Sequence, residues 1–498
     1  MSRNLDGKEH WKSILMEGLG VSVFLCLLVF QFMHINPYAP GWDQVDYSLA
    51  LERYDISKMQ PHFPGYPYYI LGGKAVAAFF GSTPEALAFF NILLYGSSLL
   101  PLYFISRRYL KRHLAVLTAV AVYSSAYSLV VANSPMSEGA AMAIFWWYFF
   151  SLVIALEKKQ WWYSLLPAFT LGLLLGIRLS YLPFGIGQAF LILLKWKRKE
   201  LDMRKSAVIV LATVLFQLLW IFGAAASEGG IKAFLSLAWG FTNGHFQEWG
   251  GTAAGDDLPF YKRLSIFLFD NVVWWGIAAR SWFILGFYLT ALSFVLLSFR
   301  KVGKFFLNDT GILSLILLTS YGIWSFTAQN IEKPRHIIPI AAILVFLLAI
   351  NLLKNQMQQH VILLVVCLIL SQSVAAVSLI KQQSAEIPAV YALSHYIEKM
   401  EEPLIVYTWE ETRVMEYLDM PYLHKRVYTY DVFLQDSAYY STKEIYLTDS
   451  VVEGFRQQGI DLSGKVEKVA QFDSNSLFDP VYHSIILYKW KKEERAAE

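Results

Sequence analysis

The stretch ILMEGLGVSVFLCLLVFQFM, residues 14–33, decides the class of fold, because it has the length and composition of a membrane-spanning helix. About 20 mainly apolar residues are needed for a helix to cross the hydrocarbon layer of a membrane. The apolar run is longer than the core of a signal peptide, and no small-residue cleavage site follows it. We therefore expect residues 14–33 to be a retained membrane anchor.

Ten further apolar runs follow this first one, so the sequence predicts eleven membrane spans. They are residues 86–105, 114–132, 139–155, 161–177, 183–194, 206–226, 282–299, 311–328, 337–353 and 361–380. The stretch 66–81 is also apolar, but it is short and contains Lys74, whose charge disfavours the bilayer centre. We expect that stretch to lie at the membrane surface or to be only partly inserted. The predicted fold class is a polytopic α-helical membrane protein.

The composition of the whole chain agrees with this class. Hydrophobic residues make up 56% of the 498 residues and charged residues only 16%. Soluble globular proteins have about 25% charged residues, so this composition excludes a soluble enzyme. The formal net charge of +3 is too small to indicate a nucleic-acid partner, which requires basic residues gathered on one face. The partner that the composition does indicate is the lipid bilayer.

The connections between the expected spans alternate in their content of Lys and Arg. The set that includes the amino terminus carries nineteen of them, among which are Arg300, Lys301 and Lys304, and the alternate set carries ten over a greater length. Because cytoplasmic loops are enriched in Lys and Arg, we expect a multi-pass protein of the cell membrane with a cytoplasmic amino terminus. Eleven spans then place the carboxyl terminus on the extracytoplasmic side.

The composition changes abruptly after residue 380, which divides the chain into two expected domains. Residues 1–380 form a multi-span membrane domain with long outer loops at 34–83 and 227–281. Loops of this length are usually functional, so we expect the chemistry on the outer face. Residues 381–498 alternate helical and strand patterns and predict a small extracytoplasmic α/β domain. Its expected helices are 388–400 and 451–458, and its expected strands are 404–407, 444–447 and 484–490.

The first outer loop contains two acidic residues in the stretch PGWDQVDY, residues 40–47. Asp43 precedes a helical pattern, as an N-cap would, and Asp46 lies on the face of that helix. One interpretation is structural, with Asp43 capping the helix and Asp46 satisfying its dipole. Two features favour a functional role. The acids follow the first span at the headgroup boundary, and the proline-rich stretch PHFPGYPYY, residues 61–69, indicates a rigid turn after them.

An acidic pair after the first span, followed by such a turn, resembles the type C superfamily of polytopic glycosyltransferases. The similarity is greatest to the dolichyl- or polyprenyl-phosphate-sugar branch, which includes protein O-mannosyltransferases and lipid A aminoarabinose transferases. The stretches SPMSE (134–138), GIRLS (176–180) and KPRHIIP (333–339) are similar to family patterns at those places. The chain departs from the family in having Gln44 after Asp43, so we expect Asp46 to supply the second acid.

The resemblance implies transfer of a sugar from a polyprenyl-phosphate donor to an extracytoplasmic acceptor, which is a glycan, a lipid or a protein. The acceptor hydroxyl needs a base, and a carboxylate at a partly dry interface suits that role. The leaving phosphate is a weak base that needs cations but no acid. A single displacement inverts the anomeric centre. The enzyme would be a hexosyl- or pentosyltransferase.

We assign Asp43 as the base and Asp46 as the residue that orients either Asp43 or the acceptor. Arg335 is the first choice for the donor phosphate, because its planar fork matches phosphate oxygens. His62, His336 and Lys74 are its expected helpers. The alternative for Arg335 and Lys74 is that they only reach the lipid headgroups from the ends of apolar segments.

Four further residues are candidates for substrate binding: Glu138, Arg178, His245 and Glu248. Each has a structural alternative, since Glu138 also fits a helix cap, Arg178 a membrane end, and the other two an interfacial loop. No cofactor is assigned. Asp43, Asp46 and Glu138 have the oxygen ligands that a divalent metal prefers, but the sequence alone does not assign a metal site.

Two other classes of function remain. A lipid or sugar transporter or flippase typically has inverted repeats or several ionisable residues at mid-bilayer depth, and the sequence has neither pattern. A noncatalytic membrane scaffold has no need for acidic residues in its first loop. Transfer from a polyprenyl-phosphate sugar in vitro separates the three classes.

Overall fold

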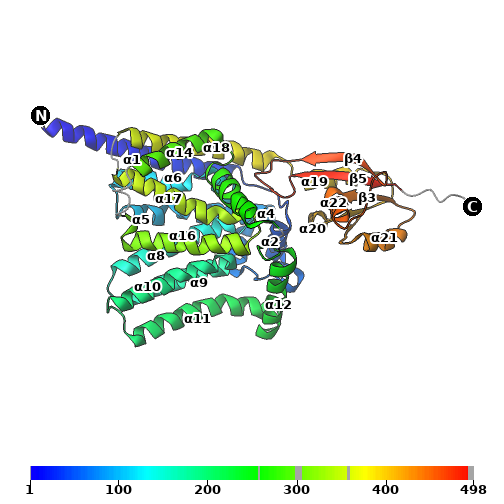
Figure 1. Ribbon diagram of the computed structural model, residues 1–498, viewed down its shortest axis with the longest axis horizontal. Coiled ribbons are helices and arrows are strands. Elements are labelled where there is room, and N and C mark those ends of the chain that lie inside the picture. Colours follow the sequence, from blue (N-terminus) through cyan, green and yellow to red (C-terminus); the bar gives the residue numbers. More distant parts are fainter. Residues whose placement is uncertain (1, 256–257, 298–304, 356–358, 492–498) are drawn as a thin grey trace, which may run out of the picture.

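The computed structural model describes residues 2–255, 258–297, 305–355 and 359–491, and it consists of a helical bundle joined to a small sheet domain (Figure 1). The amino-terminal end of α1 (Ser2–Met33) and the sheet domain lie at opposite ends of the bundle (Figure 1). Several elements of the sequence analysis lie outside the described residues: the end of the span 282–299, the charged residues Arg300, Lys301 and Lys304, and the last residues of the chain.

Eight helical segments in the described part of the chain are long and apolar enough to cross a membrane, and two bent pairs raise this number to ten. The eight are Trp11–Met33, Thr83–Ser106, Glu138–Glu157, Leu179–Lys197, Met203–Ser227, Asp309–Ala328, Pro334–Lys354 and Gln359–Glu398. The expected span at 161–177 is a shorter apolar helical segment, Trp161–Ile177. The chain is thus a multi-pass membrane protein, and the count of eleven spans stays a prediction.

Both bent helix pairs form a hydrogen bond with the same glutamine side chain. The helices α6 (Arg112–Tyr123) and α7 (Ala126–Ala132) meet at 62°, and the segments Phe260–Ile277 and α14 (Trp282–Leu297) meet at 105°. On α18 (Gln359–Ala385), the buried Gln372 accepts a hydrogen bond from the Ala126 N–H at 2.8 Å and donates one to the Ile277 carbonyl at 2.7 Å. One side chain therefore satisfies backbone groups that both breaks would otherwise leave unpaired inside the bundle.

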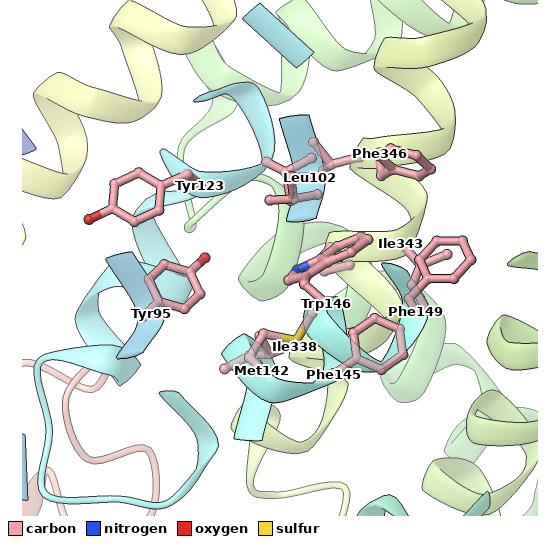
Figure 2. Packing of buried hydrophobic residues seen from close by; sticks show 14 of the residues in the cluster. Tyr95, Leu102, Tyr123, Met142, Phe145, Trp146, Phe149, Ile338, Ile343 and Phe346 are labelled. Carbon is pink, nitrogen blue, oxygen red and sulfur yellow. The ribbon is translucent and has the colours of Figure 1, made fainter. Parts of the chain in front are cut away.

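The helices α8 (Glu138–Glu157) and α17 (Ile338–Asn355) form the buried centre of the bundle. Figure 2 shows Trp146 and Phe149 of α8 lying beside Phe346 of α17, and the ring centroids of Trp146 and Phe346 are 5.5 Å apart. The outer helices α1 and α11 (Met203–Ser227) instead expose most of their apolar side chains, as expected of a surface that faces lipid.

The remaining membrane-domain elements complete the bundle and its connections. They are α4 (Thr83–Ser97), α5 (Leu99–Ser106), η2 (Trp161–Ser164), α9 (Leu165–Ile177), η3 (Leu179–Gly185), α10 (Ile186–Lys197), α16 (Asp309–Ala328) and η6 (Pro334–Ile337). The two stretches expected as outer loops are largely helical. The first contains α2 (Trp42–Glu52), η1 (Ile56–Lys58) and α3 (Pro67–Ala77), and the second contains α12 (Ile231–Gly244), η4 (His245–Trp249), α13 (Phe260–Ser265) and η5 (Ile266–Ile277).

The sheet domain contains five strands in the order β2-β1-β3-β5-β4. The strand β1 (Leu404–Thr408) pairs in parallel with β2 (Leu423–Arg426) and with the central strand β3 (Glu444–Thr448). The strand β5 (Ser484–Trp490) pairs antiparallel with β3 and with β4 (Val466–Asp473). The helices are α19 (Ala389–Glu398), α20 (Glu411–Tyr417), α21 (Tyr430–Ala438) and α22 (Asp449–Gln457). The predicted small α/β domain is therefore present, and the exact division at residues 380 and 381 stays a prediction.

Candidate functional site

The helix α2 carries both acids of the first outer segment and lies at the sheet-domain end of the bundle (Figure 1). The expectation that Asp43 is the N-cap is wrong. The N-cap is Gly41, whose N–H donates to the Gln44 side-chain oxygen at 2.8 Å, and Asp43 lies in the first turn. Its side chain is 30% exposed, whereas that of Asp46 is completely buried. Because capping is done by other groups, the Asp43 carboxylate is available for other partners.

Asp43 is bound to Arg335, and Arg335 is shared with a second carboxylate. Arg335 Nη2 lies 2.6 Å from Asp43 Oδ2, and Arg335 Nε lies 3.0 Å from Glu138 Oε1. The three residues come from α2, from η6 and from the first residue of α8. The structure thus brings together two residues that the sequence analysis treated separately, the proposed base and the proposed phosphate ligand.

Glu138 also joins this cluster to Arg178. Arg178 Nη2 lies 3.0 Å from Glu138 Oε1, and Arg178 Nη1 donates to the Ser137 hydroxyl at 2.8 Å. The same Nη2 lies 3.2 Å from His336 Nδ1. Since a guanidinium only donates, His336 Nδ1 accepts this bond and carries no proton. His336 therefore orients Arg178 rather than adding a second charge to the cluster.

Local structure explains why Glu138 and Arg178 reach the same point. The Asn91 amide donates to the carbonyls of Ser134 and Met136, at 2.8 and 2.6 Å, and so holds the turn before Glu138. At Gly176, the ring of Tyr68 packs so closely that a Cβ atom would lie 2.4 Å from it. Glycine at this position lets α3 approach α9 directly before Arg178.

A second cluster forms around Asp46. His62 Nδ1 lies 3.0 Å from Asp46 Oδ2, and His62 Nε2 lies 2.9 Å from the Tyr66 hydroxyl. The turn that carries His62 depends on Gly65, whose φ of +92° is strained for residues with a side chain. Phe241 of α12 lies parallel to the His62 ring, with centroids 6.1 Å apart.

The sequence analysis missed Arg413, which reaches Asp46 from the sheet domain. Its Nε and Nη2 donate to Asp46 Oδ1 at 3.0 and 2.9 Å. No sequence pattern marked it, because Arg413 is a single arginine in a short helix, 367 residues from its partner. Contacts of this separation leave no signal in local periodicity.

Burial and nearby charges act in opposite directions on Asp43. Burial by itself raises the pKa of its carboxyl group. Four basic groups outweigh burial and hold this pKa well below its ordinary value, namely His62, Lys333, Arg335 and Arg178. Asp43 is therefore an ionised carboxylate at neutral pH.

The balance is different at Asp46. Burial is the largest influence and raises the pKa of this carboxyl group, although the His62 hydrogen bond and the Arg413 charge oppose it. The ionised form of Asp46 therefore depends on those two partners.

Three candidates lie apart from these contacts. Lys74 is exposed on α3, and Glu248 is exposed in η4. His245 Nε2 lies 2.9 Å from the Ala328 carbonyl, which ties η4 to the end of α16. The structure joins none of the three to the Asp43 or Asp46 cluster through a described hydrogen bond or ion pair.

The described residues contain no group of three or more His, Cys, Asp and Glu arranged to hold a metal ion. The carboxylates of Asp43 and Glu138 are both bound to Arg335. This donor set does not fit a divalent metal in the arrangement described here, so no metal enters the proposed mechanism.

Comparison with solved structures relates this architecture to known proteins. ArnT from Cupriavidus metallidurans in the apo state matches with a TM-score of 0.56 and 11% identity, over 95% of this chain and 98% of that one. The same protein bound to undecaprenyl phosphate matches over the same shares, with a TM-score of 0.52 and 10% identity. The chain has the type C glycosyltransferase fold. The resemblance inferred from the acidic pair and the proline-rich turn is confirmed at this level.

Two other comparisons give partial matches. Residues 62–221 match the sequence model of the dolichyl-phosphate-mannose-protein mannosyltransferase family. This region includes His62, Glu138 and Arg178, but it leaves out Asp43 and Arg335. The apo oligosaccharyltransferase of Archaeoglobus fulgidus gives a TM-score of 0.47 and 13% identity, over 86% of this chain and 69% of that one. A comparison with curated proteins finds no match.

Proposed function

We propose that the chain transfers a hexose or pentose from a polyprenyl-phosphate donor to an extracytoplasmic acceptor, by a single inverting displacement. The observation that carries this proposal is the 2.6 Å pair between Asp43 and Arg335, which puts a partly exposed carboxylate beside a guanidinium. A base and a phosphate-binding cation are the minimum that this reaction requires. The type C fold and the binding of undecaprenyl phosphate by the Cupriavidus ArnT support the choice of donor.

In the proposed step, Asp43 removes the proton from the acceptor hydroxyl as its oxygen attacks the anomeric carbon. The bond between that carbon and the phosphate oxygen breaks, and its electron pair leaves with the polyprenyl phosphate. Arg335 binds the departing phosphate through its two parallel donors. Arg178, oriented by Glu138 and His336, adds a second positive charge nearby.

Donor binding also activates the base. Without donor, His62, Lys333 and Arg335 together lower the pKa of Asp43, which makes the carboxylate a weak base. A donor phosphate competes for Arg335 and draws it away from Asp43. The pKa of Asp43 then rises in part, because His62, Lys333 and Arg178 still lower it, so the carboxylate is a stronger base with donor present than without it.

The other candidate residues take supporting roles in this proposal. His62 holds Asp46, and Glu138 holds both arginines in place. Lys74 is exposed on α3, from which it pairs with the lipid-linked phosphate as the donor approaches. His245 and Glu248 lie in the second outer segment and bind the acceptor or the sugar.

Asp43→Asn tests the proposed base. The change keeps the shape of the side chain and removes the base, so transfer should fall by about 10² to 10⁴ while expression and membrane insertion survive. Transfer from a polyprenyl-phosphate sugar is measured in membranes with matched protein levels. Asp46→Asn should lower transfer only in part, and Glu52→Gln, an exposed change on the same helix, is the control.

Two outcomes contradict this assignment. A greater loss in Asp46→Asn than in Asp43→Asn means that the base was assigned to the wrong carboxylate. Unaltered transfer in both variants shows that neither acid belongs to the catalytic site. Movement of lipid or sugar across vesicles, with no transfer by the wild-type chain, supports the transporter or flippase instead.

A further inference from the structure

The sheet domain reaches the centre of the proposed site through Arg413 of α20. The Arg413 side chain is only 12% exposed, and the Asp46 side chain that it contacts is completely buried. Two donors of the guanidinium converge on one carboxylate oxygen, at 3.0 and 2.9 Å. A buried charge pair with this geometry is costly to break, because one charge is then left without its partner.

Arg413 also holds the chain that leads into His62. Its Nη2 donates to the carbonyls of Lys58 and Met59, at 3.5 and 3.1 Å. Its guanidinium lies over the ring of Trp42, 5.6 Å from the centroid. One side chain of the sheet domain thus joins the start of α2 to the turn before His62.

Asp46 is fully occupied by these partners. Arg413 binds its Oδ1 and His62 binds its Oδ2, and the side chain is completely buried, so a substrate does not reach it in this arrangement. Asp46 lies one turn after Asp43 on α2. The contacts of Asp46 with Arg413 and His62 therefore fix the position of α2, the helix that carries the proposed base.

We propose that Arg413 is a positioning residue for the transfer reaction, through which the docked sheet domain holds Asp46 and α2 in their working positions. This inference rests on the proposed function. It assigns the sheet domain a part in the chemistry, whereas a domain that only selects acceptors would not need to contact Asp46.

The charged and titratable groups that face Asp46 define the expected pH behaviour. They are His62 and Tyr66 from the turn, Asp43 from its own helix, and Arg413 with its partner Glu416 from α20. Burial and the charge of Asp43 raise the pKa of Asp46, and His62 and Arg413 lower it. When Arg413 is removed, His62 is left as the group that lowers this pKa, so the pKa of Asp46 rises. A smaller fraction of Asp46 is then ionised at a given pH, and activity is lost at a higher pH as the solution is acidified.

The experiment compares full-length Arg413→Gln, Arg413→Lys and wild type as a function of pH. In Arg413→Gln, kcat should fall at neutral pH, and the acid limb of the profile should move up by about 1 to 3 pH units. Arg413→Lys keeps the charge, so it should retain part of the wild-type rate, and its acid limb should lie close to the pH of the wild-type limb. Arg426→Gln is the matched control, because Arg426 also stacks on Trp42, at 5.0 Å, from the same domain. Its acid limb should stay with that of wild type.

A uniform loss of rate at every pH, or the same shift in Arg426→Gln, overturns the proposal. If Arg413→Gln does not fold, Arg413→Lys replaces it in the measurement of unfolding temperatures, which then decides. Unfolding temperatures of Arg413→Gln, Asp46→Asn and the double variant measure the coupling without the transfer reaction. A wild type without transfer defeats the proposed function. Additive unfolding shifts instead defeat the role of Arg413, so the two failures are distinguishable.

Discussion

Arg335 is shared between Asp43 and Glu138, and this sharing determines what its replacement should do. Lysine keeps the charge but has no planar fork, so it loses the bidentate match to phosphate and carboxylate oxygens. We expect Arg335→Lys to retain part of the transfer activity and Arg335→Ala to retain very little. Arg53→Ala is the control, because that side chain is 67% exposed and pairs with Asp55, away from the candidate site. Full activity of Arg335→Ala at normal expression would reduce Arg335 to an interfacial anchor.

The sequence analysis named individual candidate residues, but it did not predict the contacts between them. Asp43 was identified from the acidic loop after the first span, and Glu138, Arg178 and Arg335 from stretches that resemble patterns of the type C family. That Arg335 bridges two carboxylates depends on how α2, α8 and η6 pack together. No spacing in the sequence encodes this packing.

At the scale of elements, Gln372 should stabilise the bundle more than its neighbours do. Gln372→Leu leaves the Ala126 N–H and the Ile277 carbonyl without a partner, at about 1 to 3 kcal/mol for each buried group. The temperature of unfolding in detergent should therefore fall. The control is Ser373→Ala, whose hydroxyl donates to the Ile369 carbonyl of its own helix. Equal unfolding temperatures for the two variants would contradict this role.

The sheet domain illustrates which elements local patterns reveal. The strands β1, β3 and β5 were expected because their residues are apolar or β-branched, and the structure confirms them. The strands β2 and β4 were missed. The residues of β4 are mostly exposed and partly charged, so β4 is held by its pairing with β5 rather than by burial of an apolar face.

For the molecule as a whole, the amino terminus and the sheet domain lie at opposite ends of the bundle (Figure 1). This arrangement agrees with an odd number of crossings, and the distribution of Lys and Arg predicts which end faces the cytoplasm. A reporter fused after Glu498 should be active only in an extracytoplasmic assay, and one inserted after Lys199 only in a cytoplasmic assay. A cytoplasmic carboxyl terminus would reverse the sides of the later outer segments.

The contacts of Gln372 have a consequence for biosynthesis. Ribosomes make the chain from its amino terminus, and Gln372 follows Ala126 by 246 residues and Ile277 by 95. The exposed backbone groups at both helix breaks therefore enter the membrane long before the side chain that satisfies them. A nascent chain that stops before α18 keeps both backbone groups unpaired. The backbone hydrogen bonding at the two helix breaks is therefore completed only when α18 is inserted.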